Sequence, residues 1–222
     1  MLTSCENELN SLNLKLNVAK SVCLRIGQRF DKPCCSLHSE MGSIPWVKEA
    51  KYLGVFIVAG RQYKCCLDKA KAKFYRSSNA ILGKLGKQRN PWVALQLISS
   101  TTVPVLTYGM ESMHLNKSQR LSIDHPWDRT FMKMFSTFDH KIVKDCQCYG
   151  GFLPISLTID IGRIAFIKKL FLIDNNLLRF VGETFGSFEL TETLNRYDIH
   201  SDKDTIDYRN AIHNYFRREI AI

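Results

Sequence analysis

The chain has 222 residues, of which 45% are hydrophobic and 11% aromatic, so it can bury a sizeable core and a disordered chain is excluded. Its 31 Lys and Arg residues outnumber its 21 Asp and Glu residues, and the formal net charge of +10 favours polyanionic partners such as nucleic acid. No stretch approaches the roughly 20 apolar residues of a membrane span, because charged residues interrupt the richest one, 152–173, so no membrane partner is predicted.

The N-terminal residues predict one helix followed by strands. Hydrophobic residues recur there at helical spacing, Thr3 and Glu6 are spaced as in a capping box, and Asn13 and Asn17 favour the helix exit. Two runs rich in β-branched and aromatic residues, Val22–Ile26 and Lys51–Val58, are bounded by glycines and predict strands. We expect both to belong to a small antiparallel sheet.

From Arg61 the hydrophobic spacing becomes that of an amphipathic helix. Its apolar residues share one side at about 100° per residue, namely Tyr63, Leu67, Ala70, Phe74, Ile81 and Leu85. The opposite side carries four cations: Lys69, Lys73, Arg76 and Lys87. Between Lys48 and Arg89 there are 11 Lys or Arg residues but only Glu49 and Asp68 as acids, so this segment holds nearly all of the excess positive charge.

The next helix is predicted to begin at Asn90-Pro91, because these residue types favour the N-cap and the first helical position. It should extend from Trp92 to at least Thr102, and a break is expected at Tyr108-Gly109.

Hydrophobic residues from Leu121 to Phe135 predict a further helix that contains Pro126. Proline removes a backbone hydrogen bond and clashes with the preceding turn, so we expect a kink or two shorter helices. A last helix is predicted over Asp204–Ile220, and the clearest late helical stripe consists of Phe166, Leu170, Ile173 and Leu177.

Several short segments resemble, in order and rough spacing, the end of the palm and the thumb of reverse transcriptases from non-LTR retrotransposons. The palm-like segments are Asn17–Gly27, Trp46-Val47 and Lys51–Val55. The thumb-like segments are Phe74–Ser77 with Asn79–Ile81, Val103–Leu106 with Tyr108-Gly109, Leu115–Ser118, and Arg129 with Phe131–Lys133. Together they cover roughly residues 1–150, and the resemblance fades beyond Phe152–Pro154.

This resemblance implies an RNA-directed DNA polymerase that extends a primer with two metal ions held by palm carboxylates. In the family those carboxylates lie in earlier palm motifs, and no Asp-Asp pair occurs in this chain. We therefore expect a fragment that starts just past the catalytic turn and binds RNA and DNA as template and primer, without polymerase activity of its own. Mg²⁺ is expected only for the complete polymerase, an upstream palm is a candidate partner, and no small-molecule ligand is predicted.

The resemblance also assigns residues in the palm-like part. Lys20 matches the lysine of the fourth palm motif, a candidate general acid for the departing pyrophosphate, although an ordinary exposed lysine is the alternative. Lys51, Tyr52, Leu53 and Gly54 match the hairpin that holds the primer end, where glycine permits close approach of a phosphate. The alternative for this segment is a buried strand with a bulge at Gly54.

In the thumb-like part, the side formed by Lys69, Lys73, Arg76 and Lys87 matches the helix that follows the nucleic-acid backbone in the family. Such a side contacts phosphates without reading sequence, and its alternative is a solvated helix surface.

The cysteines and histidines predict neither disulfides nor a metal site. Zinc at Cys34, Cys35 and His38, or at Cys146 and Cys148, lacks a matching second half, and free thiols are the alternative. The absence of an N-terminal signal pattern favours an intracellular protein, cytoplasmic or nuclear, that is not secreted.

These observations predict an α+β fold in three parts: a palm remnant over 1–60, a helical thumb over 61–150 and a helical extension over 151–222. Two alternatives to a truncated polymerase remain open. One is a non-catalytic nucleic-acid-binding module, and the other is an interaction domain that self-associates through exposed palm strands.

Overall fold

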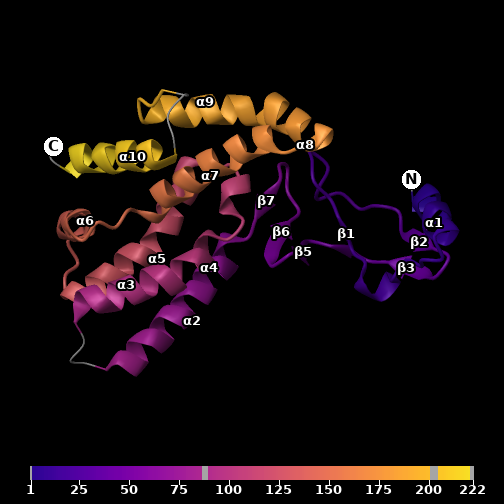
Figure 1. Cartoon of the computed structure of the whole chain (residues 1–222). Helices are drawn as coiled ribbons and strands as arrows, with labels where there is room; N and C mark the ends of the chain where they lie inside the picture. Colours follow the sequence, from indigo (N-terminus) through magenta and orange to yellow (C-terminus); the bar gives the residue numbers. More distant parts are fainter. Residues whose placement is uncertain (1, 87–89, 201–204, 221–222) are drawn as a thin grey trace. The chain divides into compact units, whose positions relative to one another are not determined.

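A computed structural model of the chain describes residues 2–86, 90–200 and 205–220, and the fold is α+β as predicted. The chain divides into two compact units, residues 1–66 and residues 67–222 (Figure 1). All described strands belong to the first unit, which holds one α-helix and three small sheets. Each unit is described by itself below.

The first unit begins with α1, Leu2–Ser11, which ends where Asn13 adopts a φ of 55°. The predicted exit at Asn13 is thus confirmed, because asparagine tolerates the left-handed conformation that often ends a helix. The predicted capping box is wrong, since Thr3 lies inside the helix and Glu6 instead accepts a hydrogen bond from the backbone N–H of Glu40 at 3.1 Å.

Two small sheets follow, so the expected single antiparallel sheet is wrong. Strand β1, Cys23–Leu24, pairs in parallel with β4, Trp46–Val47. Strands β2, Leu37–Ser39, and β3, Gly42–Ile44, form an antiparallel hairpin of their own. Each of these strands has two or three residues and pairs with one neighbour only. Segments this short carry too little alternation of polar and apolar residues to predict which strands pair.

The third sheet is antiparallel, with strand order β5-β6-β7. Its strands are β5, Glu49–Tyr52, β6, Val55–Val58, and β7, Lys64–Cys65. The run predicted as one strand over 51–58 is therefore two strands joined by Leu53 and Gly54. Their φ angles of 45° and 88° are both positive, as in the type I′ turn that suits the twist of a two-residue hairpin.

All described secondary structure of the second unit is helical (Figure 1). Its α-helices are α2 Leu67–Leu85, α3 Pro91–Thr101, α4 Val103–Thr107, α5 Lys117–Phe135, α6 His140–Tyr149, α7 Ile155–Leu172, α8 Asn176–Val181, α9 Ser187–Arg196 and α10 Thr205–Ile220. Short 3₁₀-helical and π-helical segments occur at Met110–Ser112 and Gly182–Gly186. None of the described helices combines the length and the apolar character that crossing a bilayer requires.

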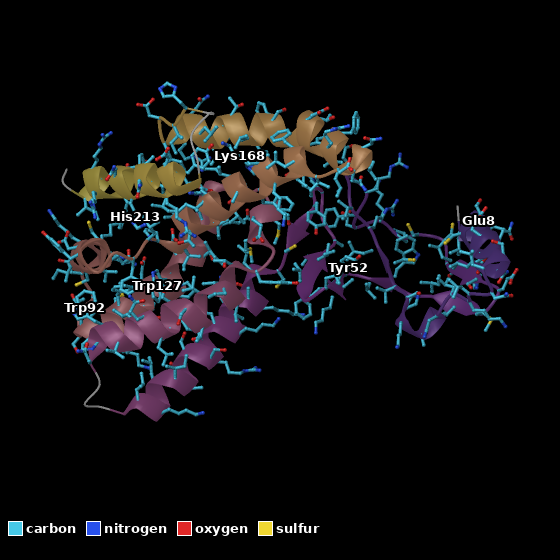
Figure 2. All side chains as sticks on the ribbon, in the orientation of Figure 1. Glu8, Tyr52, Trp92, Trp127, Lys168 and His213 are labelled. Atoms are coloured by element: carbon cyan, nitrogen blue, oxygen red, sulfur yellow. The ribbon has the colours of Figure 1, made fainter. Side chains whose placement is uncertain are left out.

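Aromatic side chains from three segments fill the centre of this unit. Trp127, which Figure 2 labels among the helices, is 1% exposed and makes edge contacts with Phe74, Phe131 and Phe152. Its indole N–H donates to the backbone carbonyl of Leu153 at 3.1 Å. A side chain of this size contributes most of its stabilisation through burial, and its one polar group is satisfied. These contacts fix α2 and α5 against the chain that enters α7.

The predicted helix ends agree with the structure at two places. The Asn90 side chain accepts hydrogen bonds from the backbone N–H groups of Trp92 and Val93, and Pro91 occupies the first turn of α3. Gly109 has a φ of 72°, so the break at Tyr108-Gly109 is confirmed. The final helix is also confirmed over its described residues, 205–220.

Two helical predictions differ from the structure in part. Of the kink or two shorter helices expected at Pro126, the second alternative is wrong, because α5 runs without interruption through this residue. The late apolar stripe is not the buried side of α7, because Phe166 is exposed, Ile173 lies just past the helix end, and Ile164 and Ile167 are buried instead.

Burial and side-chain contacts explain how α5 includes its proline. Pro126 is itself buried, and its carbonyl accepts a hydrogen bond from the Thr130 hydroxyl at 3.0 Å. A capping box at Asn116 and Gln119 fixes the first turn with reciprocal hydrogen bonds of 2.9 Å. Tertiary packing of this kind overrides the local cost of one missing backbone hydrogen bond.

Candidate nucleic-acid interface

Helix α2 has a buried side and a cationic side, as predicted. Phe74, Ser78 and Leu82 are buried. The exposed cations Lys69, Lys73, Arg76 and Lys84 fall within about 80° of one another at 100° per residue, and we call them the α2 cationic face. Lys84 was not among the predicted nucleic-acid-binding residues, although its helical spacing from Lys73 and Arg76 places it on the same side. The predicted Lys87 lies outside the described residues.

The helix begins at Leu67 and not at Arg61, because the preceding residues join the third sheet. Cys65 lies in β7, and the backbone N–H of Cys66 donates to the carbonyl of Phe56 at 2.8 Å. Tyr63, predicted on the apolar side of the helix, is therefore an exposed residue outside α2. The positions of the α2 cations are unaffected by this shorter start.

The acidic residue of α2 does not interrupt the cationic face. Asp68 forms an ion pair with Lys71, with 2.7 Å between Oδ1 and Nζ. Lys71 also donates to the Ser122 hydroxyl at 2.8 Å, which turns this half-buried lysine toward α5 and away from the other cations. Asp68 is the only acidic residue between Leu67 and Leu85, so its pairing leaves a surface of one sign.

A hollow of about 600 Å³ lies between α2 and the C-terminal half of α5. Sequence reasoning missed it, since it combines residues more than 40 positions apart in the chain. Its lining residues are Tyr75, Ser78, Asn79, Leu82, Arg129, Thr130, Met132, Lys133, Ser136 and Phe138. We call it the α2–α5 groove.

The four hairpin residues of the palm-like part form an exposed tip. Lys51 and Tyr52 end β5, while Leu53 and Gly54 form the turn, and all four are exposed. Lys51 faces Phe56 across the ladder, with its ammonium 6.0 Å from the ring centroid. The alternative of a buried strand with a bulge is wrong, because the β5–β6 pairing continues regularly to Tyr52 and Val55.

Lys20 ends a short 3₁₀ helix, Val18–Lys20, and its side chain is exposed. Its backbone N–H donates to the Asn17 side chain at 3.2 Å. Lys20 and the hairpin belong to the first unit, whereas the α2 cationic face and the groove belong to the second. The candidate interface is therefore built from the second unit alone.

The cysteines form no disulfide bonds. All eight cysteines are free thiols. Within residues 2–86, 90–200 and 205–220, no group of three or more His, Cys, Asp or Glu side chains is arranged to hold a metal ion.

A buried charge cluster ties three helices of the second unit together. Asp160 of α7 is 1% exposed and accepts hydrogen bonds from Arg120 of α5 at 2.8 and 2.7 Å, one to each carboxylate oxygen. Arg196 of α9 and the Tyr197 hydroxyl also donate to it. Burial and the Asp160 charge raise the pKa of Tyr197, so this phenol stays protonated as a donor. With every member engaged with another, the cluster is a clamp and not an open site.

A second hollow, of about 510 Å³, lies between α4, α7 and α10. Its polar lining includes Glu111, Arg209 and His213, the last of which is labelled in Figure 2. Burial lowers the pKa of His213, and the nearby Arg217 and Arg209 lower it further. The lining also includes the hydroxyl residues Ser99, Thr107 and Thr158, so the hollow is of mixed polar and apolar character.

Comparison of the chain with protein-family models, with curated proteins and with solved structures found no match. The geometry of the α2 cationic face and the α2–α5 groove is therefore the basis for the functional argument that follows.

Proposed function

We propose that the second unit binds RNA and DNA through the α2 cationic face, as the thumb of a non-LTR reverse transcriptase would. The observation that carries this proposal is the one-sided exposure of Lys69, Lys73, Arg76 and Lys84 on a helix whose other side is buried. Burial of Phe74 and Leu82 fixes the rotation of α2, so these cations face outward together. An ordinary solvated helix surface would carry mixed signs, which pair locally.

The dimensions of the face suit a phosphate backbone. At a rise of about 1.5 Å per residue, Lys69 and Lys84 are separated by roughly 22 Å along α2. Four cations spread over this length reach several successive phosphates of one strand without contacting base edges. The binding is thus expected to be independent of sequence and strongly salt-dependent.

We infer that the chain alone does not extend a primer. Two-metal catalysis needs carboxylates that hold both ions, and this sequence contains no Asp-Asp pair. Lys20 can act as a general acid only beside such a site, which palm residues outside this sequence would have to supply with Mg²⁺. The proposed role of the chain is therefore template and primer binding.

The test is charge reversal on the face, with a matched control. A Lys69→Glu/Arg76→Glu variant should bind duplex and single-stranded oligonucleotides at least about tenfold more weakly in fluorescence anisotropy. The slope of log affinity against log salt should fall by about two units, one for each lost phosphate contact. The control variant, Lys117→Glu/Lys169→Glu, changes two other exposed lysines of this unit and has the same net charge. Equal effects of the two variants, or no effect of either, would contradict the proposal.

A second candidate function, self-association, is favoured by exposed apolar residues on α8 and α9; Figure 1 shows where these two helices lie. Phe180, Phe185 and Phe188 are 60%, 67% and 74% exposed, and Leu172 and Leu177, close to them in the chain, are 85% and 70% exposed. In the π-helical segment Gly182–Gly186, Gly182 and Gly186 face Leu170 and Ile167 of α7, so this side of the segment packs on the protein. We call the three exposed phenylalanines and the two exposed leucines the phenylalanine face.

We propose that its occupant is a second copy of the chain. An aromatic side chain presents roughly 150–250 Å², so the three phenylalanines alone expose roughly 300–500 Å² per copy. Two such faces with their leucines would bury on the order of 1,000 Å², the lower limit for a specific dimer. A patch of this size matches the largest apolar patch on a typical monomer, and such patches are often functional. The exposed palm strands expected from the sequence are not needed for this association.

Light scattering coupled to gel filtration tests the dimer. The wild-type chain should show a concentration-dependent dimer, and Phe185→Glu/Phe188→Glu should be monomeric. Leu121→Glu/Tyr149→Glu, which changes two exposed apolar residues elsewhere, should still dimerise. A wild-type chain that stays monomeric at all concentrations would contradict the proposed dimer.

A further inference from the structure

The α2–α5 groove lies on the opposite flank of α2 from part of the cationic face. Taking Phe74 as the reference, Tyr75 and Asn79 fall on one flank at 100° per residue, and Lys73 and Lys84 fall on the other. The groove volume of about 600 Å³ lies within the range of small-ligand sites. A ligand in it would therefore use a surface that backbone binding by the cationic face does not require.

The groove is cationic at its α5 wall. Arg129 and Lys133, one helical turn apart, are both exposed, and the described lining includes no Asp or Glu. Lys133 Nζ donates to Asn79 Oδ1 at 3.2 Å across the groove. This contact engages the carbonyl of the Asn79 amide and leaves its NH₂ group as a donor. The wall thus offers charge for an anion and a donor for a polar ring edge.

Two aromatic rings border the same hollow. Tyr75 of α2 is fixed by an edge contact with Phe74, at 6.0 Å between centroids, and its hydroxyl lies 3.5 Å from His125 Nδ1. Phe138 follows α5 and is 84% exposed, so it contributes little to the core. Its position depends on Ser136, whose φ of 51° turns the chain out of the helix.

The hydroxyl groups at the base of the groove already have hydrogen-bond partners within the protein. The Ser78 hydroxyl lies 3.2 Å from the Thr102 hydroxyl, and Thr130 donates to the carbonyl of Pro126. A ligand is therefore recognised mainly at the rim, by two rings, two cations and one amide. Aromatic rings combined with cations bind an unpaired base and its phosphate, since every base offers a π-face.

We propose that the α2–α5 groove binds an unpaired nucleotide of a single-stranded RNA or DNA, with the base against Tyr75 and Phe138 and the phosphate at Arg129 and Lys133. The proposal rests on the nucleic-acid binding proposed above and extends it to a second site of different selectivity. Bases in a duplex are stacked and paired, so they cannot enter the groove. The cationic face should bind single strands, duplexes and abasic strands alike, because all of them carry phosphates. The groove should bind only single strands that carry bases.

Three labelled ligands and the full chain test this in fluorescence anisotropy: a single-stranded oligonucleotide, an abasic strand of equal length, and a duplex. Phe138→Ala should weaken binding of the single strand by about tenfold, which is the usual effect of removing one stacking ring. Binding of the abasic strand and the duplex should stay unchanged. Because Phe138 is exposed, the variant should fold normally, and Tyr149→Ala, another exposed aromatic residue, is the matched control.

The outcomes separate the two proposals. If Lys69→Glu/Arg76→Glu weakens all three ligands while Phe138→Ala changes none, the groove assignment is wrong and the cationic face stands. If no ligand binds the wild-type chain, both are wrong. Photo-crosslinking with a strand containing 5-iodouracil adds a direct readout: adducts at Tyr75 or Phe138 support the groove, and adducts confined to other residues overturn it.

Discussion

At the scale of single residues, Asp124 shows how the second unit uses a half-buried carboxyl group. Helix α7 has no side-chain cap of its own, because Pro154 occupies the N-cap position. Asp124 of α5 supplies one, accepting hydrogen bonds at 2.7 Å from both the backbone N–H and the hydroxyl of Ser156. Burial raises the pKa of Asp124 to about 6, even though both bonds from Ser156 lower it.

We predict that this carboxyl makes stability fall as pH rises from about 4 to about 6. Between the unfolded pKa of 3.8 and the folded value, the folded state binds more protons than the unfolded state, so each rise in pH favours unfolding. The change amounts to on the order of 3 kcal/mol in the free energy of unfolding. Asp124→Asn keeps an acceptor for Ser156 and should remove this pH dependence. Urea unfolding of both proteins across this range is the measurement, and parallel pH profiles would contradict the prediction.

Residue contacts of this kind could not be predicted from sequence. Asp160 reads in the sequence as a charge that interrupts an apolar stretch, yet it is the centre of the clamp with Arg120 and Tyr197. The partners lie 40 and 37 positions away, so no local spacing connects them. Only the fold brings such groups together, and it does so by burying charges that must then be paired.

At the scale of elements, helix ends and the exposed side of a helix could be predicted where the residues of one segment alone determine them. The cationic side of α2, the Asn90-Pro91 helix start and the Gly109 break follow from spacing and residue type alone. Prediction failed where other segments decide, as in α5, whose proline is buried by its neighbours, and in the late stripe of α7, whose exposed side is also apolar. Hydrophobic spacing cannot identify the buried side of a helix that is apolar all around.

The β5–β6 hairpin supports a prediction about its turn. Leu53 adopts a φ of 45° although it is not glycine, and its side chain is 73% exposed. The left-handed conformation is strained for leucine, and asparagine is the preferred residue before glycine in a type I′ turn. We therefore expect Leu53→Asn to stabilise the hairpin by about 0.5–1 kcal/mol.

Amide hydrogen exchange of β5 and β6 measures this locally. Leu53→Asn should slow exchange in both strands. Met41→Asn provides the control, because Met41 is an exposed apolar residue in the β2–β3 turn and has no positive φ. Slower exchange in both variants, or in neither, would mean that backbone strain at Leu53 does not limit hairpin stability.

At the scale of the whole molecule, the two units differ in how much core each can build. The most deeply buried large side chains, including Trp127, Tyr208, Phe74 and Ile212, all belong to the second unit. A further cluster there joins α7 to α9 and α10 through residues such as Ile164, Leu194 and Phe216. In the first unit, Ile44 and Cys65 are the buried hydrophobic residues among those described. The composition of the whole chain averages over both units, so it could not predict that most buried hydrophobic residues lie in the second unit.

We predict that residues 67–222 fold alone and residues 1–66 do not. A segment of this size needs most of its apolar surface buried to offset its conformational entropy, and three sheets of two or three short strands leave Val22, Ile26 and Trp46 exposed. The isolated second unit should unfold cooperatively in urea and retain the salt-dependent binding of the full chain, since the α2 cationic face lies entirely within it. The isolated first unit should give poorly dispersed amide NMR signals. Cooperative unfolding of residues 1–66 by themselves would show that their short sheets are sufficient, and loss of binding by residues 67–222 would show that nucleic-acid binding requires the first unit.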